Sequence, residues 1–273
     1  MTTPAADFSV LDHPDVLRAL FHPRREHGAS GQNQPGVETK IPGVKDLLIP
    51  VEDDFAVGAR LHLGDRTHAN ILFFHGNGEI AADYDDIGPF YNRIGANFLA
   101  ADYRGYGRST GYPTVASMMR DCHTIFRFVT EWQAQNGFSG PLILMGRSLG
   151  SASAIELAAA YPDRVSGLIV ESGFAYAGPL LLLLGIDPAA IGFREEAGFV
   201  HLDKITRFCG PLLVIHAEFD HIIPFSDGQA LFAASASADK TLLKIPAANH
   251  NDILAKGFRD YLAAIQRLTA SCL

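Results

Sequence analysis

The chain contains the stretch LILMGRSLGS at residues 142–151, which gives the strongest indication of its fold. An apolar run ends there in the pattern Gly-x-Ser-x-Gly, and an alanine-rich segment at residues 152–160 follows directly. This order predicts a strand, a sharp turn and a helix, with Ser148 on the turn. Gly146 and Gly150 leave room where the serine backbone is strained. The pattern therefore predicts an exposed Ser148 hydroxyl above a helix N-terminus, which stabilises developing negative charge.

The same pattern occurs a second time, as GRSTG at residues 107–111, so Ser109 is an alternative nucleophile. The residues around it, YRGY at 103–106 and GYP at 111–113, are typical of loops, and no helix-forming segment follows at once. Only Ser148 lies between a predicted strand and a predicted helix. We therefore expect Ser148 rather than Ser109 to be the reactive serine.

The composition suits one large α/β domain, because 48% of the 273 residues are hydrophobic and 19% are charged. A net charge of −8 makes nucleic acid and anionic membrane surfaces poor partners. Three scattered cysteines are too few for a disulfide framework or a zinc site. No signal peptide is predicted, and the longest apolar run, at residues 180–184, is too short to span a membrane. We expect a cytoplasmic protein without a membrane span; the sequence leaves its oligomeric state open.

Strand-like and helix-like segments alternate along most of the chain. Residues 1–40 are expected to form an N-terminal extension with a flexible link at 28–36, and residues 41–273 to form the domain. Strand-like runs at 46–51 and 56–63 predict a hairpin. The alternation after it predicts an α/β fold, with a mostly parallel sheet, helices on both faces and a ligand site at the carboxyl edge. Strands are predicted at 70–74, 97–101, 142–145, 168–170, 212–216 and 242–245, and helices at 82–95, 114–136, 152–160, 229–236 and around 258–268.

A serine hydroxyl is a weak nucleophile at neutral pH, so Ser148 needs a base, and the base needs an orienting acid. Asp220 follows the predicted strand at 212–216, and His250 follows the next strand at 242–245. Both therefore lie at the carboxyl edge that presents the serine, and the order serine, acid, histidine fits this strand–turn–helix arrangement. We predict Ser148 as nucleophile, His250 as base and Asp220 as acid.

Other acids and one other histidine remain as alternatives. Glu171 ends a predicted strand and is the main alternative acid, whereas Asp102 ends an earlier strand and precedes the serine. Asp252 is expected to cap the last helix or to hold the histidine loop. His221 is poorly placed to reach both the acid and the serine.

Negative charge that develops on a substrate carbonyl is stabilised by two backbone N–H donors, the oxyanion hole. One donor would be Leu149, directly after the serine. The second should come from the loop HGNG at 75–78, which follows the strand at 70–74. Asn77 is the first choice in this loop and Gly78 the second.

Together these motifs resemble the α/β-hydrolase superfamily, and within it the BEM46-like group that includes alpha/beta hydrolase domain-containing proteins 13 and 17. The resemblance implies an α/β-hydrolase fold, a triad of Ser148, Asp220 and His250, and hydrolysis of an ester or thioester without metal or organic cofactor. The cysteine-rich N-terminus of the animal type 17 proteins is absent, so protein depalmitoylation at membranes is not expected. The resemblance covers roughly residues 45–270 and rests on FHGNG at 74–78, DYRGYGRS at 102–109, GRSLG at 146–150, Asp220 with Ile223-Pro224, and NHND at 249–252.

An apolar insert at residues 173–208 follows Glu171 and is interrupted by glycine and proline. This pattern predicts one or two short helices that form a small cap above Ser148. The apolar side chains either pack the cap onto the sheet or line a slot for a short or medium acyl chain. We therefore expect a small-molecule ester or thioester as substrate.

Two other classes of protein are alternatives. The stretch GNGEIA at 76–81 follows a strand and is followed by Asp102, which fits the fingerprint of a dinucleotide-binding oxidoreductase. That interpretation leaves Ser148, Asp220 and His250 unexplained. A catalytically inactive binding protein with the same fold is the other alternative, and the complete set of three residues argues against it.

Overall fold

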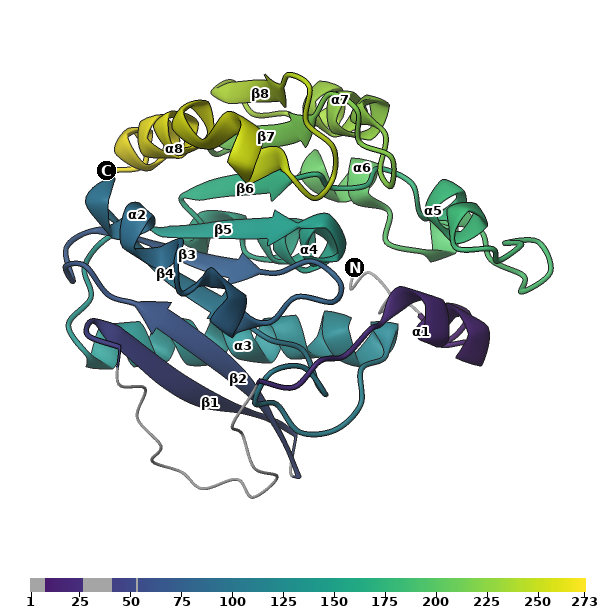
Figure 1. The fold of residues 1–273 in the computed structure, drawn as a ribbon, viewed down its shortest axis with the longest axis horizontal. Coiled ribbons are helices and arrows are strands. Elements are labelled where there is room, and N and C mark those ends of the chain that lie inside the picture. The colour runs from purple at the N-terminus through teal and green to yellow at the C-terminus, as the bar shows by residue number, and fades with distance from the viewer. Residues whose placement is uncertain (1–7, 27–40, 53) are drawn as a thin grey trace.

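The computed structural model describes residues 8–26, 41–52 and 54–273. In these residues a single sheet of eight strands forms the centre of the protein (Figure 1). The strands are β1 (Val44–Glu52), β2 (Phe55–His62), β3 (Ala69–Phe74), β4 (Ala96–Ala101), β5 (Leu142–Arg147), β6 (Gly167–Glu171), β7 (Leu212–Ala217) and β8 (Lys240–Ile245). Their spatial order is β1-β2-β4-β3-β5-β6-β7-β8.

The sheet is antiparallel at one edge and parallel elsewhere. β1 pairs with β2 as the predicted hairpin, with Val44 opposite His62, and β2 also runs antiparallel to β4. Asp53, which separates the two segments in the sequence, lies outside the described residues. All remaining pairs are parallel, and every residue of β3, β4, β6 and β7 is buried, as expected for strands covered on both faces. The predicted fold class is confirmed.

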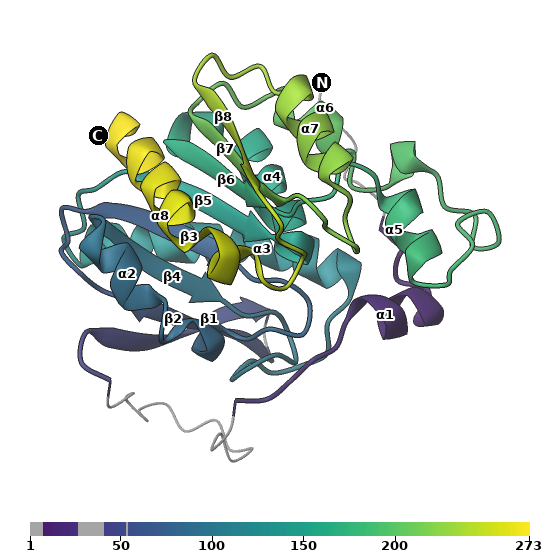
Figure 2. The same cartoon turned by 45° about the horizontal axis from the view of Figure 1, so that its top comes forward.

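Helices cover both faces of the sheet (Figures 1 and 2). They are α1 (Pro14–Leu20), α2 (Gly88–Arg93), α3 (Val115–Gln135), α4 (Ser151–Ala160), α5 (Ala177–Leu183), α6 (His201–Ile205), α7 (Phe225–Ala234) and α8 (Ile253–Ser271). α2 and α8 pack on one face, and α3, α4 and α7 on the other, so the sheet separates two apolar clusters. In β3, Leu72 and Phe74 belong to one cluster and Phe73 to the other, as the two-residue period of a strand requires.

The helix predicted at 82–95 is divided in the structure. A 3₁₀ turn spans Ala81–Tyr84, and α2 begins only at Gly88. Pro89 explains the break, because proline has no N–H to donate to the carbonyl oxygen of Asp85 and is tolerated only in the first turn of a helix, where it stands in α2. The helix predicted at 229–236 begins earlier, at Phe225, directly after Pro224. The other predicted helices form close to their expected positions.

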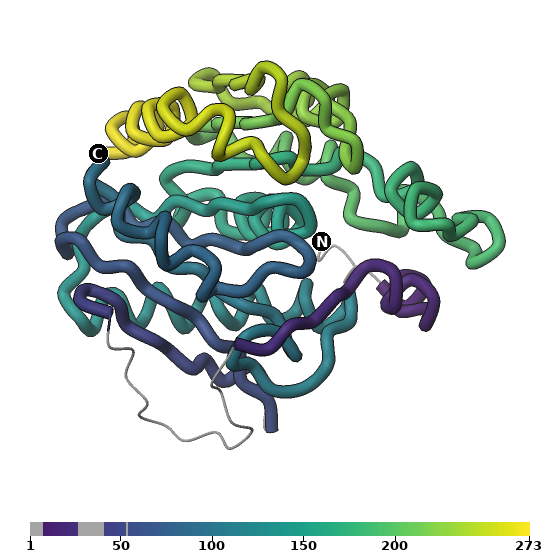
Figure 3. The backbone as a smooth tube through the Cα atoms, viewed as in Figure 1, coloured from purple at the N-terminus to yellow at the C-terminus, as the bar shows by residue number. Residues whose placement is uncertain are grey.

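The N-terminal segment at residues 8–26, here called the arm, packs against the domain. Five of its apolar side chains are buried, and the carboxylate of Asp12 accepts a hydrogen bond of 2.7 Å from the N–H of Val115 at the start of α3. Figure 3 shows the arm running from beside α5 across the loops that follow β3 and β4. The predicted link at 28–36 lies outside the described residues. The buried side chains of the arm are Phe8, Leu11, Val16, Leu20 and Phe21.

The insert at 173–208 contains two helices, α5 and α6, and a 3₁₀ turn at Glu195–Ala197. The carboxylate of Glu195 accepts hydrogen bonds from the first N–H groups of α5, those of Ala177 and Gly178. Figures 1 and 2 show α5 beyond the carboxyl ends of the strands, next to α1, while α6 packs against α4 and α7. Leu182 and Leu183 of α5 are exposed, whereas seven large apolar side chains of the insert are buried in the core, namely Phe174, Leu181, Ile186, Phe193, Phe199, Ile205 and Phe208.

Candidate active site

The structure brings Ser148, His250 and Asp220 into one hydrogen-bonded chain at the carboxyl edge of the sheet. His250 Nε2 lies 3.0 Å from Ser148 Oγ. His250 Nδ1 lies 2.8 Å from Asp220 Oδ2 and 3.0 Å from Oδ1. The three residues follow β5, β7 and β8, whose carboxyl ends meet here because the strands are parallel. A hydroxyl, an imidazole and a carboxylate in this order can transfer a proton from the serine.

The turn at Ser148 has the strained backbone that the sequence pattern predicts. Ser148 has a φ of 50°, in the left-handed region that side chains disfavour. A Cβ on Gly146 would lie 2.3 Å from the carbonyl oxygen of Gly150, and a Cβ on Gly150 would lie 2.0 Å from that of Phe74. Only glycine therefore allows β5, the following helix and β3 to approach this closely.

The carboxylate of Asp220 is held by its own loop as well as by His250. Its Oδ1 accepts hydrogen bonds of 3.0 Å from the N–H of Ile222 and 2.8 Å from the N–H of Ile223. Burial alone would raise the pKa of Asp220, but the hydrogen bond and charge of His250 hold it below its ordinary value. The carboxylate is thus ionised at neutral pH and orients the imidazole.

Asn77 and Leu149, the two expected oxyanion donors, are held in different ways. Leu149 follows the serine in a 3₁₀ turn at Ser148–Gly150. The Asn77 side-chain oxygen accepts hydrogen bonds of 2.7 Å from the Tyr106 hydroxyl and 2.8 Å from the backbone N–H of His22 in the arm. Within the described residues, the backbone N–H of Asn77 donates no hydrogen bond, so it remains available to a ligand.

Comparison with known proteins places this site in a family. The family model described as serine aminopeptidase, S33, matches residues 65–188. Protein bem46 of Schizosaccharomyces pombe is 29% identical over 266 residues, and the match covers 90% of this chain and 84% of that protein. Human alpha/beta hydrolase domain-containing protein 17B is 29% identical over 211 residues, covering 73% of this chain and 66% of that protein. The chain belongs to the α/β-hydrolase superfamily, in its BEM46-like group.

Solved structures share the fold of this α/β-hydrolase. The esterase Pf2001 of Pyrococcus furiosus superposes with a TM-score of 0.67 at 16% sequence identity, covering 88% of this chain and 98% of that chain. The family match ends at residue 188, so it includes β3 to β6 and the serine turn of this hydrolase. Asp220, His250 and the arm lie outside that match, and their placement comes from the structure.

The hydroxyl of Ser109, the alternative nucleophile, contacts a backbone N–H, and no hydrogen bond joins it to a base in the described part of this hydrolase. Its side chain is fully buried, and its hydroxyl oxygen accepts a hydrogen bond of 2.9 Å from the N–H of Gly58. The GRSTG stretch lies in the loop after β4, where Gly107 forms a bridge with Arg25 of the arm. The second serine pattern therefore fastens the arm to the sheet.

Glu171, the alternative acid, contacts other groups than His250. Its Oε2 accepts a hydrogen bond of 2.6 Å from the Tyr261 hydroxyl, and its Oε1 lies 3.1 Å from Arg147 Nε. Asp252 accepts a hydrogen bond of 2.7 Å from the N–H of Asn249 and makes no side-chain cap to α8, so it holds the histidine loop. His221 is exposed to solvent.

Asp102 does not have the place that a dinucleotide fingerprint requires. It is buried, and its Oδ1 accepts a hydrogen bond of 2.8 Å from the N–H of Ala81. A 3₁₀ turn rather than a long helix follows the glycine loop at 76–81. Asp102 therefore holds the loop after β3, and its carboxylate is not free to bind a ribose.

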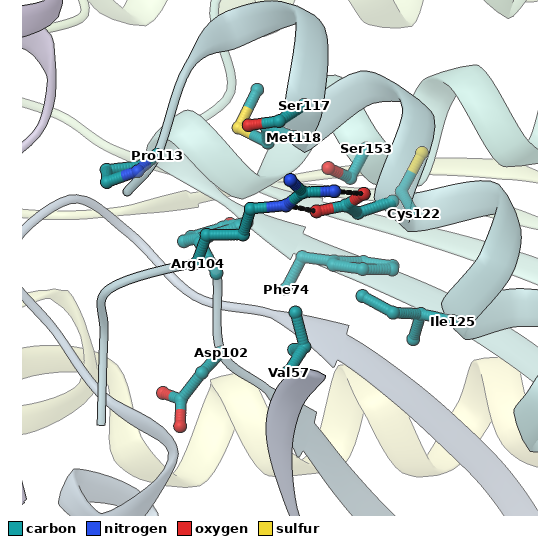
Figure 4. Close-up of a pocket in the computed structure, with 12 residues that line it drawn as sticks. Val57, Phe74, Asp102, Arg104, Pro113, Ser117, Met118, Cys122, Ile125 and Ser153 are labelled. Carbon is teal, nitrogen blue, oxygen red and sulfur yellow. Dashed lines mark hydrogen bonds and ion pairs between the residues drawn. The ribbon is translucent and has the colours of Figure 1, made fainter. Parts of the chain in front are cut away.

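Neither a second catalytic centre nor a metal site appears elsewhere in the described residues. A narrow pocket beside α3 is lined by Arg104, Asp121 and mostly apolar side chains, and includes none of Ser148, Asp220 and His250 (Figure 4). No group of three or more metal-ligating side chains gathers in the described part of the chain. Within the same residues, no helix combines the length and hydropathy needed to cross a membrane.

Proposed function

We propose that this chain is a serine hydrolase that cleaves a carboxylic ester or thioester of a small molecule through an acyl-enzyme. The observation that carries the proposal is the hydrogen-bonded chain from Ser148 Oγ through His250 to Asp220, with Nε2 3.0 Å from the hydroxyl. An inactive binding protein would have no need of an ionised, doubly held Asp220 behind the imidazole.

In the proposed reaction, Ser148 Oγ attacks the substrate carbonyl carbon while His250 Nε2 takes the hydroxyl proton. Asp220 fixes the tautomer with the proton on Nδ1 and stabilises the imidazolium that forms. The backbone N–H groups of Asn77 and Leu149 would donate to the carbonyl oxygen as it becomes negative. The imidazolium then protonates the departing alcohol or thiol, and a water molecule, activated by the same histidine, hydrolyses the acyl-enzyme.

The insert favours a short or medium acyl chain. Phe174, Leu181, Phe193 and Phe199 are already buried in the core and pack the insert, so its exposed large apolar side chains are confined to α5 and the residue before it, namely Tyr176, Leu182 and Leu183. Each methylene that a slot does bury contributes about 0.8 kcal/mol. The rate should therefore rise over the first few carbons and fall once the slot is full. The word esterase in the name of the Pyrococcus furiosus structure agrees with an ester substrate.

A fluorophosphonate probe tests the proposed nucleophile. We expect the probe to label the wild-type chain at Ser148, with Ser109→Ala labelled at the wild-type rate and Ser148→Ala unlabelled. Peptide mapping by mass spectrometry identifies the modified residue. Labelling that persists in Ser148→Ala contradicts the assignment.

A panel of p-nitrophenyl esters from acetyl to palmitoyl, repeated with the matching thioesters, tests the substrate class. We expect kcat/KM to be highest at a short or medium chain. A rate that keeps rising to the longest chain contradicts the proposed slot, and activity on neither series contradicts the proposed substrate class.

A further inference from the structure

Arg147, the residue before the serine, joins three separate parts of the site. Its side chain is only 12% exposed. Nη2 donates a hydrogen bond of 2.7 Å to the carbonyl oxygen of His250, and Nε donates one of 3.1 Å to Glu171. Nη1 forms an ion pair with Glu79. One guanidinium on the serine turn therefore contacts the histidine loop, the end of β6 and the loop after β3.

Glu79 connects Arg147 to the loop that contains Asn77. Its Oε2 accepts hydrogen bonds of 2.7 Å from the N–H of Gly76 and 2.7 Å from the hydroxyl of Tyr84. A Cβ on Gly76 would lie 2.6 Å from Arg147 Nη1, so a side chain at that position would displace the guanidinium from its present place. The position of the Asn77 backbone is thereby tied to Arg147.

Glu171 passes the contact on to α8. Its second carboxylate oxygen accepts the hydrogen bond from Tyr261, which lies on the helix that follows the histidine loop. Arg147 thus holds His250 directly through its carbonyl and is connected, through Glu171 and Tyr261, to the middle of the helix that follows the histidine loop. Asp220 contacts only the ring of His250, so ring and backbone are held by different residues.

The charges of this cluster depend on one another. Burial raises the pKa of Glu171, and Arg147 opposes that effect. Burial would also raise the pKa of Glu79, but the charge of Arg147 together with the hydrogen bonds from Tyr84 and Gly76 holds the pKa below its ordinary value. Two poorly solvated carboxylates share a single guanidinium, so the forked geometry of arginine is needed to reach both of them and the carbonyl at once.

We propose that Arg147 is a positioning residue that sets the distance between the oxyanion loop, Ser148 and His250 through its contacts with Glu79, Glu171 and the His250 carbonyl. This inference rests on the proposed serine hydrolase function. A lysine at this position keeps the charge but has a single nitrogen, so it cannot hold all three partners together. Because a displacement of about 1 Å in a reacting group can cost a hundredfold in rate, the loss should appear in kcat.

Arg104 provides a matched control away from the site. It is as well buried as Arg147 and binds Asp121 through two hydrogen bonds of 2.6 and 2.7 Å (Figure 4). A third hydrogen bond of 2.9 Å joins it to Glu52. Replacing it by lysine disturbs a comparable ionic cluster without touching the residues around Ser148.

The experiment compares the full-length wild type with Arg147→Lys and Arg104→Lys by thermal unfolding, by steady-state kinetics on a short p-nitrophenyl ester, and by binding of a trifluoromethyl ketone. We expect Arg147→Lys to lose roughly 30- to 100-fold in kcat with KM changed less than about threefold. Affinity for the ketone, which mimics the tetrahedral state, should fall by a similar factor. Arg104→Lys should change kcat less than about twofold. Equal losses of kcat in the two variants would overturn the proposal.

Glu79→Gln tests the positioning role of Arg147 if Arg147→Lys does not fold. Glutamine keeps an acceptor for the N–H of Gly76 but removes the ion pair with Arg147. We expect it to lower kcat roughly tenfold; an unchanged kcat overturns the proposal. Fluorophosphonate labelling separates this inference from the function on which it rests. A wild type that is not labelled at Ser148 overturns both. A labelled wild type together with an equally fast Arg147→Lys overturns the positioning role alone.

Discussion

The imidazole of His250 faces the carboxylate of Asp220 with Nδ1 almost equally far from both oxygens, at 2.8 and 3.0 Å. Such an arrangement fixes the tautomer that leaves Nε2 free to accept the proton of Ser148. It also separates the role of this acid from that of Glu171, which contacts Arg147 and Tyr261.

Asp220→Asn should therefore reduce kcat by about 10⁴, because an amide nitrogen facing Nδ1 favours the wrong tautomer. Glu171→Gln should reduce kcat by less than about tenfold, since an amide oxygen still accepts from Arg147. Steady-state kinetics on one p-nitrophenyl ester measures both. A severe effect of Glu171→Gln with a mild effect of Asp220→Asn would reverse the assignment of the acid.

Tyr106→Phe should weaken the hold of the arm on the oxyanion loop. The variant removes the hydroxyl that donates a hydrogen bond of 2.7 Å to the side-chain oxygen of Asn77 and accepts a hydrogen bond from the N–H of His22. We expect kcat to fall by roughly tenfold with little change in KM, because the backbone N–H of Asn77 is then less well placed. Tyr161→Phe, which removes a hydroxyl bonded to His123 away from the site, is the control for kinetics and melting temperature. Equal kcat values for the two variants would contradict this role of Tyr106.

Acid should destabilise the folded protein through His201. Burial lowers the pKa of His201 to about 3, whereas the unfolded chain takes up this proton near pH 6.5. Between these values the unfolded state binds more protons, so stability falls by about 1.4 kcal/mol for each unit of acidification. Urea unfolding at pH 7.5, 6.0 and 5.0 should show a smaller loss in His201→Asn, whose amide can still donate to the Phe174 carbonyl. The exposed His221→Asn is the control, and an identical pH slope in wild type and His201→Asn would refute the prediction.

Gly150→Ala should prevent the serine turn from forming. Its new methyl group would lie 2.0 Å from the carbonyl oxygen of Phe74, which is backbone and cannot move without displacing β3. We expect destabilisation of more than about 3 kcal/mol, or no soluble protein. Gly64→Ala is the control, because its methyl group would meet only side-chain atoms, the nearest at 3.2 Å. Thermal unfolding compares the two, and a Gly150→Ala midpoint close to that of Gly64→Ala would count against the steric argument.

The residues near the ends of the strands could be predicted from the sequence. The apolar pattern locates each strand, and the order of the strands along the chain indicates which residues reach the same edge of the sheet. Ser148, Asp220 and His250 each follow an apolar run, and parallel strands bring such positions to one edge. The break before α2 is also predictable from the sequence, since Pro89 stands within the segment 82–95 whose apolar spacing predicts one helix.

The contacts of Arg147 and of the arm could not be predicted in the same way. Arg147 is 68 residues from Glu79 and 103 from His250, and nothing in its neighbours along the chain indicates which acids it meets. The apolar residues of the arm indicate that it is buried, but they do not indicate which part of the domain it packs against. Contacts of this kind depend on the packed tertiary structure, so a local sequence pattern does not predict them.

The arm also affects the order in which the protein can assemble during synthesis. Asp12 leaves the ribosome long before its partner Val115, 103 residues later, and Phe8 packs against the ring of Phe199, which is made later still. At about 5–20 residues per second, the first of these gaps alone lasts on the order of 5 to 20 s. Throughout that time the buried side chains of the arm have no docking surface. The His22 N–H likewise waits for both of its acceptors, Asn77 and Tyr106, which are made 55 and 84 residues later.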